Sequence, residues 1–237
     1  MTTIAAPLDT GRSWRPADGV TPRGHVVLLA GRGEHAGVYE RFGRRLAYDG
    51  YRVSAVSGAG TDELDRALRA GDGVRPLVLA GSDTGALEAL TLAGALDVAG
   101  VLLAGTPTTS STPDLAGTDE LDARTACPIH RARLHDDVAF VRGRLSAPVP
   151  SRLLAAALDA RVTVPVLLVH GGADPVAPVA GVRELAGRLP RAELAVVRGG
   201  RHDVLNDLHH RTVAGHIVGW LERLRIDRLA VSLWEGS

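Results

Sequence analysis

The stretch PLVLAGSDTGAL, residues 76–87, decides the fold. An apolar run ends at Ala80, a helical pattern begins at Thr84, and Asp83 lies between the glycines of the turn, Gly81 and Gly85. A strand that turns this sharply into a helix needs small residues beside the apex, because the apex takes a strained backbone and its neighbours pack closely. Gly81 and Gly85 meet this need, so the pattern predicts Asp83 at the apex. The N–H of Thr84, at the helix start, is then directed toward a ligand.

Outward from this turn, short apolar runs alternate with amphipathic segments. The runs are nearly continuous in hydrophobicity, which indicates burial on both faces, as in a parallel sheet covered by helices. The segments between them repeat apolar residues at three and four, the helical period. This alternation predicts a doubly wound, mostly parallel α/β sheet. The expected strands are 25–30, 51–56, 75–80, 98–105, 164–171 and 192–199, and the expected helices are 37–50, 62–71, 84–96, 179–189 and 207–224.

One region interrupts the alternation. Residues 112–160 contain no strand-like run, carry several prolines and are densely charged. The region follows a core strand, at the sheet edge where ligand sites of open α/β sheets collect. We therefore expect a short helical cap over the site at 112–160, inserted between core parts 1–111 and 161–237.

Composition excludes several classes of function. The chain has 237 residues, which suits one α/β domain, and a formal net charge of zero, which gives no reason to expect nucleic acid or an anionic membrane as partner. No apolar stretch approaches the ~20 residues of a membrane span. Cys127 is the only cysteine, and the N-terminus lacks a signal-peptide pattern. We expect a cytoplasmic protein without disulfides.

Three stretches, 28–53, 76–87 and 164–207, carry a resemblance to a known superfamily. They are similar to the α/β-hydrolases, and most resemble the monoacylglycerol lipase and lysophospholipase-like branch. That branch shows His-Gly-x-Gly-Glu-His after its third strand and Gly-x-Ser-x-Gly after its fifth. Here Ala30 replaces the first His, and Asp83 stands at the serine position. Gly31, Gly33, Glu34 and His35 match the first motif.

The resemblance implies a catalytic acid at Asp174 and a catalytic base at His202. Each follows a strand in a glycine-containing loop, and the order nucleophile, acid, histidine is that of this fold. A carboxylate on one imidazole nitrogen fixes the tautomer and supports the cation that forms when the other nitrogen takes a proton. The backbone N–H groups of Arg32 and Thr84 are the expected oxyanion hole.

An aspartate at position 83 favours chemistry other than ester hydrolysis, because a carboxylate that attacks an ester carbonyl forms an unfavourable anhydride. Its natural target is a saturated carbon with a leaving group or a strained ring, which gives an alkyl-enzyme ester that water activated by His202 hydrolyses. Epoxide hydrolases and haloalkane dehalogenases of the superfamily are similar in this respect. The choice between them stays open: the tyrosines (Tyr39, Tyr48 and Tyr51) lie outside the cap, and Thr84 stands where dehalogenases often have tryptophan.

The expected ligand is a small organic substrate. Candidate binding residues are Gly31, Ser82, Arg124, His130 and Arg131, although a solvated helix face is an equal interpretation of the last three. Other functions also remain open: a general-base lyase, isomerase or cyclase, an esterase or lipase-like hydrolase, and a catalytically silent binding protein. No histidine and acid spacing indicates a metal site, and we expect no cofactor.

The C-terminal tail carries a further expectation. It is apolar enough to pack on this chain or on a second copy, as in a homodimer. The residues responsible are Leu229, Val231, Leu233 and Trp234.

Overall fold

The computed structural model describes residues 11–57, 61–71, 73–111, 115 and 117–226. In this part of the chain one seven-stranded sheet has the order β1-β3-β2-β4-β5-β6-β7. β1 pairs antiparallel with β3, and all other neighbours are parallel. The strands are β1 (Gly11–Trp14), β2 (His25–Leu29), β3 (Arg52–Val56), β4 (Leu77–Ser82), β5 (Gly100–Ala104), β6 (Val166–Gly171) and β7 (Ala192–Val197).

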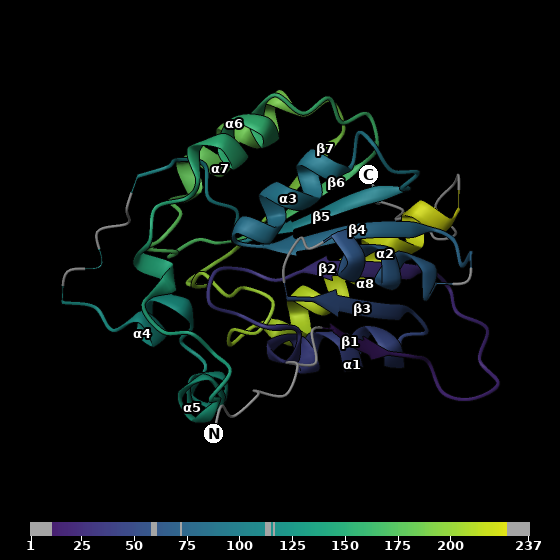
Figure 1. Ribbon diagram of the computed structural model, residues 1–237, viewed down its shortest axis with the longest axis horizontal. Helices are drawn as coiled ribbons and strands as arrows, with labels where there is room; N and C mark the ends of the chain where they lie inside the picture. Colours follow the sequence, from purple (N-terminus) through teal and green to yellow (C-terminus); the bar gives the residue numbers. More distant parts are fainter. Residues whose placement is uncertain (1–10, 58–60, 72, 112–114, 116, 227–237) are drawn as a thin grey trace, which may run out of the picture.

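Helices cover both faces of the sheet, as the continuous hydrophobicity of the central strands requires. One face packs against the buried sides of α1 and α8, with Phe42 and Trp220 at its centre. The other packs against α2, α3 and α7 (Figure 1). These helices are α1 (Glu40–Tyr48, preceded by the 3₁₀ turn η1, Ala36–Tyr39), α2 (Thr61–Arg69), α3 (Thr84–Leu92), α7 (Val179–Arg188) and α8 (His210–Arg225).

The segment between β5 and β6 is helical and has two parts. Its first helices lie beyond one end of the sheet, at the lower left of Figure 1. Its last helix instead packs on α3 and joins the core through Leu154 and Ala157. Only the first part is therefore placed as a cap. The elements are α4 (Glu120–Arg124), α5 (Pro128–Asp136), the 3₁₀ turn η2 (Arg144–Ser146) and α6 (Ser151–Leu158).

The predicted fold class is confirmed, with each expected strand and helix found within a few residues of its predicted bounds. The sequence did not predict β1, a four-residue edge strand with three exposed positions, because so short and exposed a strand leaves no hydrophobic pattern. No helix in the described ranges has both the length and the apolar character that a membrane crossing requires. The tail residues Leu229, Val231, Leu233 and Trp234 lie outside the described residues.

Candidate active site

The bend after β4 consists of Asp83 alone. β4 ends at Ser82 and α3 begins at Thr84, so the single residue between them takes φ 51° and ψ −122°, a conformation that L residues rarely adopt. Close backbone packing explains the glycines on either side. A Cβ on Gly81 would lie 2.0 Å from the carbonyl oxygen of Gly85, and a Cβ on Gly85 would lie 2.2 Å from that of Leu29. The strain at Asp83 is thus held in place by the surrounding backbone.

We expect Gly81→Ala to lower the free energy of unfolding by about 3 kcal/mol, because the added methyl meets backbone atoms that have no room to move. Chemical denaturation measures this change. Gly219→Ala is the matched control: nothing lies within 4 Å of its Cβ position on the exposed side of α8, so the same substitution should stabilise by up to about 1 kcal/mol. Equal stability of the two variants would show that the bend tolerates bulk.

His202 and Asp174 meet at the carboxyl ends of β6 and β7. The Nδ1 atom of His202 lies 2.8 Å from Oδ2 of Asp174. The other oxygen, Oδ1, accepts hydrogen bonds from the N–H groups of Val176 at 2.8 Å and Ala177 at 3.0 Å. Asp174 therefore orders its own loop and orients the imidazole with the same carboxylate.

Asp83 faces this pair. Its Oδ1 atom lies 3.4 Å from Nε2 of His202, an ion-pair distance, and Nε2 has no well-aligned hydrogen bond to any described residue. The Oδ2 atom accepts the backbone N–H of Arg32 at 2.9 Å. Both Asp83 and His202 have only 1% of their surface exposed. The two carboxylate oxygens are therefore in different environments, one beside a backbone donor and one beside the imidazole.

The Arg32 side chain was not among the sequence-based candidates, which included only its backbone N–H. Its Nε atom donates to Oδ2 of Asp83 and its Nη2 atom to Oδ1, each at 2.8 Å, while Nη1 donates to the carbonyl of Ala147 in the cap. A buried aspartate requires a counter-charge. In the sequence, only this need of Asp83 for a counter-charge indicates that a cationic side chain such as Arg32 lies beside it.

Charge pairing sets the protonation states. Burial by itself raises the pKa of Asp83, but the contacts with His202 and Arg32 outweigh it and hold that pKa well below its usual range. Burial favours neutral His202, yet the charges of Asp174 and Asp83 raise its pKa to about 10. The pKa of Asp174 is lowered, since His202 outweighs the effect of burial. At neutral pH the site therefore holds two carboxylates, an imidazolium and a guanidinium, with balanced charge.

The predicted binding residues separate into two groups. Gly31 lines a cavity of about 550 Å³ beside Arg32, which is the size of a small-molecule site, and Thr84, the expected oxyanion-hole donor, lines it too. Gly31 packs tightly behind Asp83: a Cβ there would lie 2.8 Å from the Cβ of Asp83. Ser82 is buried as the last residue of β4.

The cap candidates do not reach this cavity. Arg124 is fully buried and pairs with Glu34 at 3.4 Å, Glu120 at 3.1 Å and Asp203 at 3.3 Å. His130 is also buried, 3.2 Å from Asp203, and Arg131 is partly exposed and paired with Asp122 at 2.5 Å. The structure thus assigns Arg124 and His130 to a cluster that joins the cap to the core.

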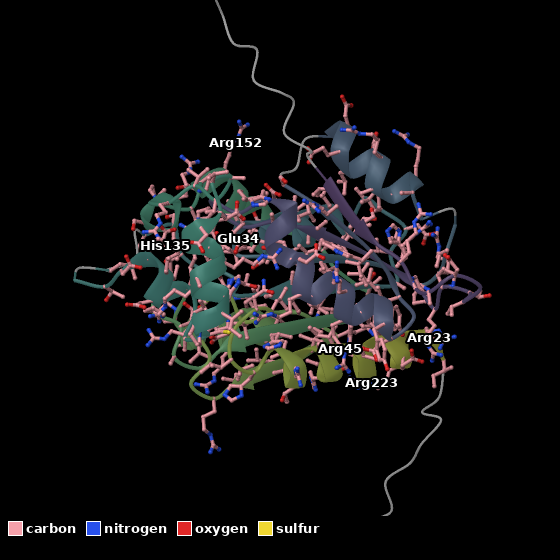
Figure 2. The ribbon with its side chains drawn as sticks, turned by 90° about the horizontal axis from the view of Figure 1, so that it is seen from below. Arg23, Glu34, Arg45, His135, Arg152 and Arg223 are labelled. Atoms are coloured by element: carbon pink, nitrogen blue, oxygen red, sulfur yellow. The ribbon has the colours of Figure 1, made fainter. Side chains whose placement is uncertain are left out.

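That cluster also holds the loop that carries Arg32. Arg124 donates to the carbonyl of Arg32 at 2.5 Å, and Glu34 accepts from Gly31 N–H at 3.2 Å and from the Tyr39 hydroxyl. Burial and the charge of Asp203 raise the pKa of Glu34 to about 7. Figure 2 shows Glu34 where the cap helices meet the core. Arg124 of the cap therefore holds in place the loop whose Arg32 backbone N–H donates to Asp83.

Comparisons with known proteins agree with this fold. The sequence profile of the family "Serine aminopeptidase, S33" matches residues 103–209. A monoacylglycerol lipase of Mycolicibacterium smegmatis is 29% identical over 216 residues, which covers 88% of this chain and 67% of the relative. The crystal structure of Paleococcus ferrophilus monoacylglycerol lipase has a TM-score of 0.73 at 21% identity, covering 90% of this chain and 98% of that one. A carboxyl esterase from Bacillus coagulans, in complex with glycerol, has a TM-score of 0.73 at 17% identity, covering 91% and 94%.

Proposed function

We propose that the chain is a hydrolase of the α/β-hydrolase superfamily and that Asp83 is a nucleophile that attacks a saturated carbon of a small organic substrate. The matching family profile and the similarity to monoacylglycerol lipases support a hydrolase. The attack forms a bond between a carboxylate oxygen and carbon, and the leaving group departs with its electron pair. Water then adds to the carbonyl of the alkyl-enzyme ester as His202 takes one of its protons. When the tetrahedral intermediate collapses, the bond from the carbonyl carbon to the alkyl oxygen breaks, the oxygen takes that proton from His202, and the alcohol leaves as the carboxylate of Asp83 returns with loss of the second water proton.

The different environments of the two Asp83 oxygens carry this proposal. Oδ2 accepts the Arg32 backbone N–H at 2.9 Å, whereas Oδ1 lies on the side of His202. When Oδ1 attacks, Oδ2 becomes the carbonyl oxygen of the ester and already lies against the donor that stabilises an oxyanion. Removal of one such donor costs about 3 kcal/mol in known enzymes. Thr84, at the start of α3, is the proposed second donor.

Ester formation also prepares His202 for its role. In the free enzyme the negative charges of Asp174 and Asp83 raise the pKa of His202 to about 10, so the imidazole is protonated at neutral pH. Alkylation removes the charge of Asp83 and with it one of the two causes. The pKa of His202 then falls, and the imidazole loses its proton and acts as a base for the hydrolytic step.

The proposed reaction, attack on a saturated carbon, differs from the ester hydrolysis that the names of the similar proteins describe. Monoacylglycerol lipase and carboxyl esterase are the descriptions of the similar proteins, and they support a hydrolase. A carboxylate nucleophile, however, converts an ester substrate into an anhydride, which is uphill. Alkyl halides and strained rings such as epoxides suit Asp83 better.

Oxygen labelling tests the covalent step. A panel of alkyl halides, epoxides, lactones and short esters identifies a substrate, which then reacts in a single turnover with excess enzyme in ¹⁸O-water. We expect one heavy oxygen in the peptide that contains Asp83 and none in the peptide that contains Asp174. Heavy oxygen found only in the product would mean that water attacks directly, and the covalent assignment would then be wrong.

A further inference from the structure

The Arg32 guanidinium occupies both carboxylate oxygens of Asp83, the proposed nucleophile. It binds both oxygens of Asp83 at 2.8 Å, including Oδ1, the oxygen proposed to attack. Its side chain is only 8% exposed. Asp83 is therefore fully engaged in the described state, and Oδ1 has to be released before it reaches carbon.

The release depends on what replaces Asp83. A neutral substrate would leave a largely buried guanidinium without its anion, and an uncompensated buried charge is strongly unfavourable. A substrate with its own carboxylate offers the guanidinium the same two-oxygen partner. The exchange then swaps one ion pair for another.

The cavity beside Arg32 favours an anion. Arg144 lies on its wall, is exposed, and forms no ion pair with another described residue. Two carboxylates, Glu34 and Glu88, also lie on the wall: Glu34 is paired with Arg124 at 3.4 Å, and burial raises the pKa of Glu88. The cavity of about 550 Å³ thus presents two arginines to a ligand.

We propose that the substrates are small carboxylates with a leaving group on the carbon next to the carboxylate, and that Arg32 exchanges Asp83 for the substrate carboxylate. This inference rests on the proposed function. Arg32 contacts Asp83 directly, so an anion bound to the guanidinium lies beside the nucleophile, and the carbon in reach of Oδ1 is the adjacent one. For a 2-halocarboxylate, the bond from Oδ1 to the α-carbon forms as the carbon–halogen bond breaks, and halide leaves with the electron pair.

Anion binding tests the exchange without any reaction. Propionate is titrated by calorimetry into the wild type, Asp83→Asn and the double variant Asp83→Asn with Arg32→Met. Removal of the competing carboxylate should tighten propionate binding by about tenfold or more, and Arg32→Met should abolish that gain. Asp83→Ser replaces Asp83→Asn if the latter does not fold. Equal binding by the single and double variants would overturn the exchange.

Alkylation kinetics test the substrate class. We compare bromide release and the mass of the Asp83 peptide for 2-bromopropionate and its neutral match, 2-bromopropionamide. The acid should react about 100-fold faster in the wild type, and Arg32→Met should remove this preference.

The two tests fail in distinguishable ways. If the amide alkylates Asp83 as fast as the acid, the substrate class is wrong and the covalent function stands. If neither compound alkylates Asp83 but propionate binding depends on Arg32 as expected, the covalent function is wrong and the anion exchange stands.

Discussion

Replacing Asp83 with Asn should lower kcat by about 10⁴-fold or more, because a neutral amide oxygen is a far weaker nucleophile than a carboxylate. We expect no neighbouring residue to replace Asp83 as the nucleophile. Asp83 is the single residue of the strained bend between β4 and α3, where φ is 51°. Steady-state product release with the best substrate of the panel measures the loss.

The control for this variant is Asp97→Asn, which makes the same chemical change at a side chain that is 94% exposed. It should retain wild-type kcat. Circular dichroism and thermal melting establish that both proteins are folded. Asp83→Asn with undiminished kcat would contradict a nucleophilic role, and with it the alkyl-enzyme ester.

His202→Gln should separate the two chemical steps. Attack by Asp83 requires no base, so alkylation proceeds, whereas hydrolysis of the ester slows by about 10³-fold without the imidazole. Rapid mixing should therefore show a burst of about one equivalent of leaving group per enzyme, followed by almost no further release. The peptide that contains Asp83 should carry the mass of the alkyl group.

His216→Gln, an exposed histidine on α8, is the matched control and should turn over normally. Loss of both the burst and the turnover in His202→Gln would mean that the imidazole acts before the ester forms, as in a general-base reaction without covalent attack. In the wild type, the rate of ester hydrolysis should fall as the pH is lowered, since protonation of His202 in the ester form removes the base.

The extent of sequence-based prediction differs between the fold and the site. The strands around β4 and the bend at Asp83 were predictable because hydrophobic periodicity and small residues at a turn are local properties of the chain. His202 and Asp174 were found through a motif order, and the structure brings them within 2.8 Å of each other.

The cap was less predictable. Arg124 and His130 are hydrogen-bond donors in an insertion, which suits a leaving oxygen or an anion, but both are buried and paired with Asp203. Asp203 directly follows His202 in the sequence, and nothing in its neighbourhood distinguishes it from a solvated loop residue. Its partners lie 79 and 73 residues away, so no local pattern indicates them.

By itself the sequence determined the sheet, the helices that cover it and the position of a carboxylate at the sharpest bend, since each follows from periodicity and backbone sterics over a few residues. Only the tertiary structure decided how that carboxylate is neutralised. The Arg32 guanidinium reaches Asp83 across 51 residues of sequence. A long flexible side chain chooses its partner by proximity in the folded state, where a buried charge is stable only beside an opposite one.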